Sequence, residues 1–589
     1  MIRFDDLTGD RRSWTFSDPE AGGRSTSIDT VRTTIVDAES RAREHDEWVV
    51  MAIAYEAAPA FDPAMRTAPS PPEGIPFVWW RSFRARHPTD PLVPAPTRIT
   101  SRERRTNRWP FPEAVELVRD RIALGDVYQV NVTDRFDGRF DGAPLDVYRA
   151  LLGVQRCAYG ALVDLGPRVV ASASPELFFR WGHDGRIACR PMKGTAPRQP
   201  RADADEAVGA ALLDSEKDRA ENVMIVDLLR NDLGRIAALG SVQVPDLFTL
   251  ERYETVWQLT SSVHAETRAG VTLVDVMAAL FPCGSVTGAP KIAAMGIIAD
   301  LEAHPRGVYC GALGFLAPPG AGPRAVFSVP IRTAVLDPAT ATYEYGAGAG
   351  ITWSSDPAAE DAEVRAKARI LTRSHREVAL LETMRLDDHG LANVELHVDR
   401  LASSAGWFGF PFDRSAVVQR LRALERDVHG VERVRVVLER SGEVRVERSA
   451  LDDAPTVVRL ALDDAVTRSD DPFCCHKTTW RRHYDDARRR HPGADDVVLV
   501  NERGCALETT IANLAFFVEG RWWSPPLTDG GLAGIARHVA IADGRLAERS
   551  IRAAELRDCE QLAVLNDLRG WRRAVLSVDV RSRSTSGHG

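Results

Sequence analysis

Lys193 and four acidic residues with helical spacing are the side chains in this sequence that could do chemistry together. A lysine attacks a substrate carbon once its amine is neutral, and Lys193 lies in the run Arg190-Pro-Met-Lys-Gly-Thr195. The acidic residues form two pairs of equal spacing, Asp218 with Glu221 and Glu360 with Glu363. Because residues i and i+3 share a helix face, the carboxylates of each pair can converge on Mg²⁺, which prefers oxygen ligands. Solvated helix faces are the alternative interpretation.

Two further features could bind anions. The run Tyr345-Gly-Ala-Gly-Ala-Gly-Ile351 permits close backbone approach, so its N–H groups could hold a carboxylate. Arg332, in Val329-Pro-Ile-Arg-Thr333, could form a bidentate pair with a substrate carboxylate. Taken alone, a tight turn and a surface salt bridge explain them as well.

A second candidate lysine, Lys477, lies far downstream in a different sequence context, which suggests two active sites on one chain. At 589 residues the chain is too long for one ordinary core, so two or more domains are expected. The polar stretch at residues 372–377 separates two periodic segments and is the preferred boundary.

Hydrophobic periodicity indicates the elements that must position these residues. The helix expected at 216–230 carries Asp218 and Glu221, so the first acidic pair should share one face. The other expected elements are a buried strand at 48–54, a Pro-rich loop at 68–74, a helix at 111–124, strands at 430–447, 495–500 and 514–518, and helices at 394–407 and 479–490.

Composition excludes several classes of function. The hydrophobic fraction is 44% and the charged fraction 27%, as in globular proteins, and the net charge of −8 gives no basic field for nucleic acid. No run of 18 apolar residues predicts a membrane span. The N-terminus lacks the order of a signal peptide, and the eight cysteines include no CxxC pattern. We therefore expect reduced thiols and a cytoplasmic location.

Seven ordered segments resemble the chorismate-utilising enzymes: anthranilate synthase component I, aminodeoxychorismate synthase component I and the isochorismate synthases. These segments are residues 125–131, 174–176, 191–195, 218–222, 281–291, 331–333 and 347–363. The resemblance implies a Mg²⁺ ion held mainly by Glu221 and Glu363, with Asp218 and Glu360 nearby. It makes Glu176 the acid that helps the ring hydroxyl depart. Its implied substrate-binding residues are Arg332, Ser285, Thr287, Lys291, Gly348 and Gly350.

Lys193 separates the members of this family. Anthranilate synthases resemble Pro-Ile-Ala-Gly-Thr at this position, whereas aminodeoxychorismate synthases typically carry lysine. In the latter, the lysine amine is thought to add at ring carbon 2 and expel the 4-hydroxyl, after which ammonia attacks carbon 4 and expels the lysine. Gln258 stands where many members have histidine, and glutamine cannot carry a proton near neutral pH. Both residues favour amination at carbon 4, although a charge-balancing role for Lys193 remains the alternative.

Residues 378–575 resemble fold-type IV pyridoxal-phosphate enzymes, the group of branched-chain aminotransferase, D-amino acid aminotransferase and 4-amino-4-deoxychorismate lyase. The segments that carry the resemblance are 381–385, 397–401, 476–479, 501–504, 507–514, 532–537 and 566–570. The resemblance implies that Lys477 forms the Schiff base with pyridoxal 5'-phosphate and that Glu508 pairs with the pyridine nitrogen. Arg400 and backbone N–H groups near Ile535 and Ala536 would bind the cofactor phosphate.

Two positions depart from that second pattern. The usual Asp-Gly-x-Phe entry is replaced by Glu377-Val-Ala-Leu-Leu-Glu382. Asp567 replaces a serine beside the phosphate site, where an acid is unfavourable, so we expect its side chain to point away. A decayed domain kept for assembly is the alternative to an active one.

The expected fold class is α+β, with an N-terminal two-sheet α/β sandwich and a C-terminal two-subdomain fold like that of branched-chain aminotransferase. The expected boundaries are 1–372 for the chorismate-binding domain, 373–379 for a linker, 380–575 for the cofactor domain and 576–589 for a disordered tail.

Together the two resemblances imply synthesis of 4-aminobenzoate from chorismate, first by amination at carbon 4 and then by elimination of pyruvate. No Cys–His–Glu amidotransferase pattern is present, so a separate glutamine amidotransferase subunit is expected to supply ammonia. A homodimer through the C-terminal half is expected, and no nucleic acid or membrane partner is. The alternatives are an anthranilate synthase component I joined to an aminotransferase, and a non-catalytic C-terminal scaffold that recruits the glutaminase.

Overall fold

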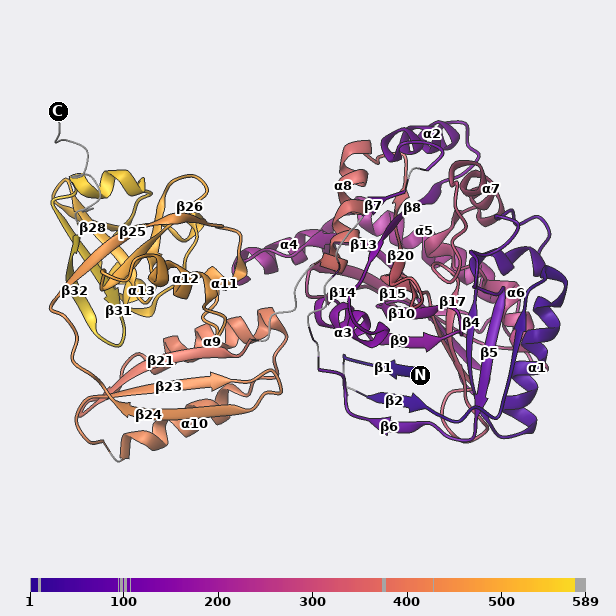
Figure 1. Ribbon diagram of the computed structural model, residues 1–589, viewed down its shortest axis with the longest axis horizontal. Coiled ribbons are helices and arrows are strands. Elements are labelled where there is room, and N and C mark those ends of the chain that lie inside the picture. Colours follow the sequence, from indigo (N-terminus) through magenta and orange to yellow (C-terminus); the bar gives the residue numbers. More distant parts are fainter. Residues whose placement is uncertain are drawn as a thin grey trace. The chain divides into compact units, whose positions relative to one another are not determined.

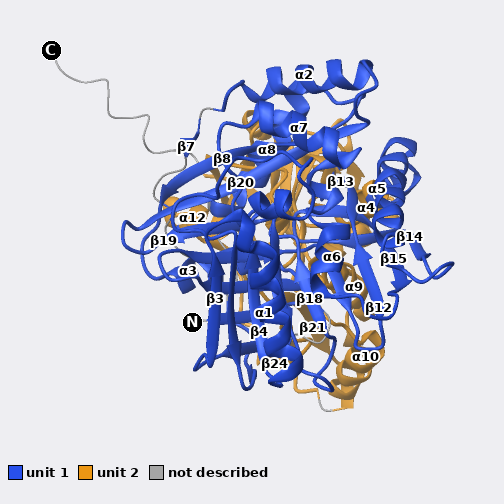
Figure 2. Cartoon of the chain, turned by 90° about the vertical axis from the view of Figure 1, so that its right-hand side faces the viewer, with its two compact units in different colours: residues 1–198, 209–375 blue, residues 199–208, 376–589 orange. Residues whose placement is uncertain are grey.

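The computed structural model describes residues 2–8, 12–93, 95, 99, 103–105, 107–372, 378–426 and 428–577. The chain forms two compact units (Figure 2). Unit 1 comprises residues 1–198 and 209–375, and unit 2 comprises residues 199–208 and 376–589. Most of the expected linker and of the expected tail lie outside the described residues.

Unit 1 contains two large antiparallel sheets (Figure 1). The first sheet runs in the order β16 (Gly288–Ala289), β8 (Gln129–Arg139), β20 (Thr342–Ile351), β19 (Thr333–Asp337), β10 (Val169–Ser174), β9 (Tyr159–Asp164), β1 (Ile2–Asp5), β2 (Ser13–Phe16) and β6 (His87–Thr89), with β7 (Glu103–Arg104) beside β8. The second runs in the order β13 (Met192–Pro197), β15 (Val256–Glu266), β12 (Arg186–Arg190), β11 (Leu177–Trp181), β18 (Ala325–Ser328), β17 (Ala312–Leu316), β4 (Trp48–Ile53), β5 (Val78–Phe83) and β3 (Ala21–Ser25), with β14 (Gln243–Arg252) beside β15.

Helices cover the outer faces of these sheets, and apolar side chains fill the space between them. The helices are α1 (Val31–Glu44), α2 (Phe111–Ala123), α3 (Pro144–Val154), α5 (Glu216–Gly234), α6 (Leu273–Leu280), α7 (Lys291–Leu301) and α8 (Pro357–Ala368); α4 (Ala202–Asp214) divides its residues between the units. Strand β4 is buried on both faces, because Val50 packs with Phe4 of the first sheet while Val49 and Met51 pack with Ile35 of α1. This double burial explains the unbroken apolar run of the strand.

Unit 2 contains a four-stranded and an eight-stranded sheet. The smaller has the order β22 (Gly390–Leu391), β21 (Leu380–Asp387), β23 (Glu432–Leu438) and β24 (Val444–Ala450). The larger has the order β27 (Ala506–Thr509), β26 (Asp496–Asn501), β25 (Val457–Thr467), β32 (Gly570–Leu576), β31 (Gln561–Asn566), β28 (Asn513–Val518), β29 (Arg521–Ser524) and β30 (Ala547–Glu548). The helices are α9 (Val394–Phe408), α10 (Arg414–Ala423), α11 (Pro472–Cys475), α12 (Arg482–Arg490) and α13 (Ile535–Ala542).

The predicted α+β class is confirmed, with two antiparallel sheets in the N-terminal part and two subdomains in the C-terminal part. The helix expected at 479–490 begins only at Arg482. Thr478 and Trp480 form a turn before it, in which the Trp480 N–H donates to the Thr478 hydroxyl at 3.2 Å. Among the described residues, none of the helices has both the length and the apolar character that a membrane crossing requires.

Candidate functional site

A cavity of about 260 Å³ in unit 1 gathers most of the residues that the sequence singled out. Strands of both sheets and helices α5 and α8 contribute its lining. The predicted residues on its wall are Lys193, Glu176, Asp218, Glu221, Glu360, Glu363, Ser285, Arg332, Gly348 and Gly350. Residues separated by more than 180 positions in the chain therefore share one cavity.

Lys193 lies on β13 and faces the glycine run of β20. A Cβ atom added at Gly350 would lie 2.7 Å from Lys193 Nζ and 2.4 Å from Gln129 Nε2, so only glycine leaves room for both side chains. Burial lowers the pKa of Lys193, and the positive charge of Lys367 lowers it further, whereas the charge of Glu221 opposes the shift. The amine is thereby shifted toward the neutral form that a nucleophile needs.

Glu176 sits where the chain passes from β10 of the first sheet to β11 of the second. The Ser174 hydroxyl donates to the Val329 carbonyl at 2.6 Å, which fixes this crossing. Burial raises the pKa of Glu176 to about 7, although a hydrogen bond from Ser285 and the charge of Lys193 act in the opposite direction. Its Oε1 atom is buried without a hydrogen-bond partner, so this carboxyl is available to a molecule in the cavity.

The two acidic pairs come from the first two turns of α5 and α8. The Ser215 hydroxyl caps α5 and contacts Asp218 at 2.5 Å, and Ser355 donates to Glu360 at 2.7 Å. The Thr352 hydroxyl donates to Glu221 at 3.3 Å. Each of these three carboxylates therefore has one hydrogen bond from the protein and oxygen lone pairs left over.

The donor set of this cavity fits Mg²⁺, provided that water or substrate completes the coordination. Within the described ranges, no three Asp, Glu, His or Cys side chains lie close enough to hold a metal by themselves. Magnesium is commonly held by one or two carboxylates and keeps several waters. Glu221 and Glu363 could each supply one carboxylate, since both line the cavity.

Lys367 is a cavity residue that the sequence analysis missed. Its Nζ lies 2.5 Å from Glu363 Oε1 and donates to the Gly348 carbonyl at 2.9 Å. Its own carbonyl accepts from Arg332 Nη1 and from the Tyr345 hydroxyl, both at 3.3 Å. The i,i+4 spacing from Glu363 was the available signal. Lys367 therefore links helix α8, the glycine run and Arg332, and adds a cation to the wall.

Thr287 and Lys291 are not among the lining residues of this cavity. Lys291 Nζ makes a buried ion pair with Asp232 at 2.8 Å and donates to the Leu280 carbonyl at 2.9 Å. The Thr287 hydroxyl donates to the Cys283 carbonyl at 3.0 Å. Both side chains thus stabilise the loop that presents Ser285.

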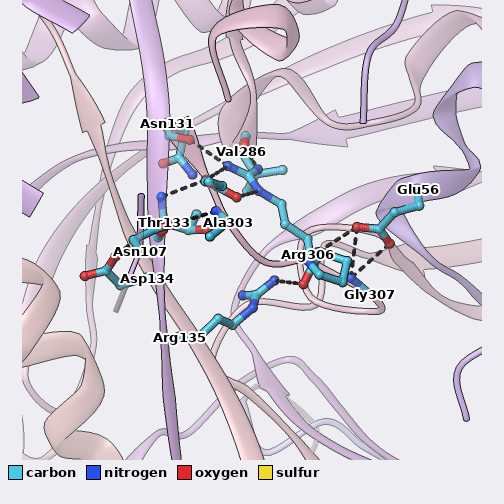
Figure 3. Close-up of polar contacts among 12 residues, drawn as sticks. Glu56, Asn107, Asn131, Thr133, Asp134, Arg135, Val286, Ala303, Arg306 and Gly307 are labelled. Carbon is cyan, nitrogen blue, oxygen red and sulfur yellow. Dashed lines mark hydrogen bonds and ion pairs between the residues drawn. The ribbon is translucent and has the colours of Figure 1, made fainter. Parts of the chain in front are cut away.

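Arg306 lies within a cluster of polar contacts that includes Asn131 and Val286 (Figure 3). Arg306 donates to the carbonyls of Val286 at 2.7 Å and Asn131 at 2.8 Å, and Val286 and Asn131 both line the cavity. Glu302 binds the same guanidinium at 2.6 Å and accepts the Thr133 N–H at 2.9 Å. Because β16 pairs only with the first residues of β8, these two side chains occupy the place of a neighbouring strand.

Lys477 occupies the turn between α11 and α12 in unit 2. The Lys477 carbonyl accepts the Leu381 N–H at 2.9 Å, and the Thr479 N–H donates to the Ala379 carbonyl at 2.9 Å, so the turn is fixed to the start of β21. Burial lowers the pKa of Lys477 to about 8, with further lowering by Arg400 and opposition from Glu382 and Glu508. The amine is therefore neutral in a large fraction of molecules near pH 8.

Glu508 lies on β27 with its carboxylate buried. The Tyr484 hydroxyl donates to its Oε1 at 2.7 Å, and Asn513 donates to Oε2 at 3.3 Å. Burial raises the pKa of Glu508 to about 7. Such a carboxyl can share a proton with a ring nitrogen.

Arg400 and Ile535 line a second cavity, of about 290 Å³. The Arg400 guanidinium makes two hydrogen bonds with Glu382, at 2.8 and 2.6 Å, and donates to the Ala533 carbonyl at 2.8 Å. Ile535 and Ala536 open helix α13, whose first N–H groups can receive an anion. Lys477 and Glu508 do not line this cavity, but the charges of Arg400 and Glu508 both act on Lys477. A buried amine, a buried carboxyl and a cation beside a helix start are a donor set that fits pyridoxal phosphate.

Asp567 is bound by two side chains of the neighbouring helix region. Its carboxylate contacts His397 Nε2 at 2.9 Å and accepts from Asn393 Nδ2 at 2.7 Å. The His397 contact lowers the pKa of Asp567 even though burial opposes the shift. The other ring nitrogen of His397 contacts Glu382 at 2.6 Å, so the extra acid is neutralised within a buried network.

Comparison with known proteins finds a family match for the segment that contains each site. Residues 9–373 match the chorismate binding enzyme family, and the chain belongs to that family. Residues 379–576 match the family described as amino-transferase class IV. The protein thus joins a chorismate-binding domain to a class IV aminotransferase-like domain, which confirms both resemblances found in the sequence.

Relatives of two activities are nearly equally similar to the first domain. An aminodeoxychorismate synthase from Streptomyces griseus is 42% identical over 48% of this chain and 39% of its own length. An anthranilate synthase component 1 from Methanothermobacter thermautotrophicus is 40% identical over 49% of this chain and 58% of its own length. The crystal structure of anthranilate synthase component I from Streptococcus pneumoniae matches with a TM-score of 0.53 and 26% identity, covering 62% of this chain and 92% of that one. The chain thus matches less than two thirds of the length of either curated relative.

Proposed function

We propose that this protein makes 4-aminobenzoate from chorismate in two reactions, one in each unit. The observation that carries the proposal is the position of Lys193, a half-buried lysine with a lowered pKa that shares a cavity with Glu176 and two acidic pairs. Overall identity does not discriminate, because synthases of the 2-amino and 4-amino products are 40% and 42% identical to the chain. The nucleophile residue therefore decides the assignment.

In the first reaction the Lys193 amine adds to ring carbon 2 of chorismate, and the ring double bonds shift as the 4-hydroxyl leaves. Glu176 gives the departing hydroxyl its proton, so water is released; its pKa of about 7 suits an acid that works near neutrality. Ammonia then attacks carbon 4, the double bonds shift back, and the lysine leaves carbon 2. The ammonia passes its extra proton to the Glu176 carboxylate, which restores the acid.

The remaining wall of the cavity binds and orients the substrate. Arg332, Lys367 and the backbone at Gly348 and Gly350 face the carboxylates of chorismate. Mg²⁺, when bound by Glu221 and Glu363, supplies positive charge for a substrate carboxylate. Gln129, whose buried amide atoms have no hydrogen-bond partner, lies beside Lys193 and can hold a small polar molecule such as ammonia.

In the second reaction unit 2 removes pyruvate from 4-amino-4-deoxychorismate. Pyridoxal phosphate, when bound, supplies the electron sink for loss of a ring proton. Lys477 holds and moves that proton, and Glu508 keeps the cofactor nitrogen protonated. Arg400 and the N–H groups of Ile535 and Ala536 hold the phosphate. The enolpyruvyl group then leaves the ring and takes that proton to become pyruvate, which leaves an aromatic product.

Two further features belong to the proposal. Ammonia comes from a separate glutamine amidotransferase, and unit 2 forms a homodimer, as class IV domains commonly do. Both would be seen directly as complexes in solution, by light scattering with and without the glutaminase.

The test is incubation of the purified protein with chorismate, Mg²⁺ and an ammonium salt, with pyridoxal phosphate present or omitted and the products identified by mass and absorbance. We expect 4-amino-4-deoxychorismate without the cofactor and 4-aminobenzoate with it. Anthranilate as the main product would instead identify an anthranilate synthase joined to an aminotransferase. Lack of cofactor-dependent absorbance would identify unit 2 as a scaffold.

A further inference from the structure

Lys193 is presented by an irregularity in strand β13. Met192 pairs with Thr260 of β15 and Thr195 pairs with Gln258, so two residues of β13, Lys193 and Gly194, oppose the single residue between those partners. Such a bulge bends a strand and redirects its side chains. Here it occurs at the residue that faces the cavity.

Gly194 makes the bulge possible. Its φ of 86° lies in the left-handed region that favours glycine, and a Cβ added there would lie 3.0 Å from Asp218 Cβ. The bulge leaves the carbonyls of both extra residues without backbone hydrogen bonds to strand β15. Buried carbonyls without partners destabilise a structure, so other groups must replace the ladder.

Two side-chain amides provide the missing hydrogen bonds. Gln258 Nε2 donates to the Gly194 carbonyl at 2.9 Å, and Asn222 Nδ2 donates to the Lys193 carbonyl at 3.4 Å. Gln258 Oε1 in turn accepts from the Thr195 hydroxyl at 2.9 Å. The Asn222 amide is itself oriented by Ser261, whose hydroxyl donates to its Oδ1 at 2.6 Å.

We propose that Gln258 and Asn222 are positioning residues. Their hydrogen bonds stabilise the bulge and thereby orient the Lys193 amine toward Gly350. This inference rests on the proposed function, in which that amine attacks chorismate. It gives Gln258 a role that needs a donor and an acceptor on one uncharged side chain. Glutamate has the same shape but no donor for the Gly194 carbonyl, and methionine has the same length but neither group.

The role differs from substrate binding in its kinetic signature. If Gln258 acts through Lys193, its loss misplaces the nucleophile while the groups that bind the substrate carboxylates remain. Misplacement of a reacting group by an ångström can cost about 100-fold in rate. We therefore expect kcat to fall and KM for chorismate to stay nearly constant.

The experiment measures amination of chorismate by the full-length Gln258→Met and Gln258→Glu variants with Mg²⁺ and ammonium. We expect kcat to fall about 10- to 100-fold in both, with KM changed less than about threefold. Gln243→Glu, at an exposed glutamine of the neighbouring strand β14, is the control and should keep wild-type kinetics. Unchanged kcat, or a rise of KM at constant kcat, would overturn the inference.

A second measurement does not depend on turnover. Brief acetylation with acetic anhydride, followed by peptide mass analysis, gives the extent of labelling of Lys193 relative to Lys217, which lines the same cavity. We expect this ratio to shift about threefold or more in Gln258→Met, because the Lys193 amine changes its surroundings. An unchanged ratio contradicts the inference whatever the product is. Wild-type protein that makes no 4-amino product contradicts the proposed function instead.

Discussion

The ammonium of Lys367 lies 2.5 Å from Glu363 Oε1 and also donates to the Gly348 carbonyl. One side chain thus connects a candidate metal ligand to the glycine run.

Replacement of Lys367 by methionine keeps the aliphatic part of the side chain and removes its charge, so we expect kcat/KM for chorismate to fall about tenfold or more, mostly through KM. Steady-state kinetics at saturating Mg²⁺ tests this; Lys217→Met, which removes another cation of the wall, is the comparison, and an equal effect there would show that only total charge matters.

Lys193→Ala should abolish formation of 4-amino-4-deoxychorismate, because the proposed reaction needs the Lys193 amine to add to carbon 2. Lys193→Arg keeps the positive charge but cannot act as a nucleophile at neutral pH. It should therefore be as inactive as the alanine variant. Substantial activity of the arginine variant, measured by product mass, would support the charge-balancing role instead.

The amination should weaken as pH rises above neutrality. Burial raises the pKa of Glu176 to about 7, so its carboxyl is protonated below that pH and loses the proton above it. Because the departing hydroxyl needs that proton, kcat measured at saturating and constant free ammonia should decline through pH 7 to 8. Glu176→Gln should lower kcat about 100-fold or more and flatten this part of the profile. A profile that keeps its shape in the variant would assign the titration to another group.

Loading of pyridoxal phosphate should accelerate as pH approaches 8. Burial lowers the pKa of Lys477 to about 8, and only the neutral amine reacts with the cofactor aldehyde. The rate of appearance of cofactor absorbance in the apo-protein should thus rise below pH 8 and level off above it. Lys477→Ala should show no such band, whereas Val466→Ala, at an exposed residue of strand β25, should show the wild-type one.

Arg306→Met should destabilise the protein strongly, because it leaves the Glu302 carboxylate buried without its partner. Breaking a buried pair in this way costs about 3–5 kcal/mol in the free energy of unfolding. Arg66 pairs with Asp300 on the surface nearby, and Arg66→Met should cost less than about 1 kcal/mol. The denaturation midpoints of both variants test the contrast; similar midpoints would mean that the buried pair contributes no more than an exposed one.

Periodicity predicted the elements whose pattern reflects local burial. The helix at 111–124 is α2, and that at 216–230 is α5, because their apolar faces repeat at helical spacing. The start predicted for the helix at 479–490 was wrong, because Thr478 and Trp480 form a turn held by side-chain hydrogen bonds and the helix begins at Arg482. No periodic pattern reports such a turn.

The sequence named most of the predicted site residues that line the cavity, but it could not separate lining residues from those that support them. Ser285 and Lys291 belong to one motif, yet only Ser285 lines the cavity, and the buried Asp232 accounts for Lys291. The place of Lys367 in the cavity could not be predicted, because a lysine four residues after a glutamate is common on helices. Only the fold shows that this helix faces the glycine run.

Arg306 and Glu302, which bind the edge of β8 in place of a neighbouring strand, also affect the tendency of the protein to self-associate at high concentration. Thr133 N–H and the Asn131 carbonyl point from the same edge of β8, and bare edges of this kind recruit strands from other molecules. Two charged side chains occupy those groups and offer no ladder to an incoming chain. Because Asn131 and Thr133 are buried, another molecule could reach this edge only after the region opens, so we expect Arg306→Met to increase self-association under partly unfolding conditions.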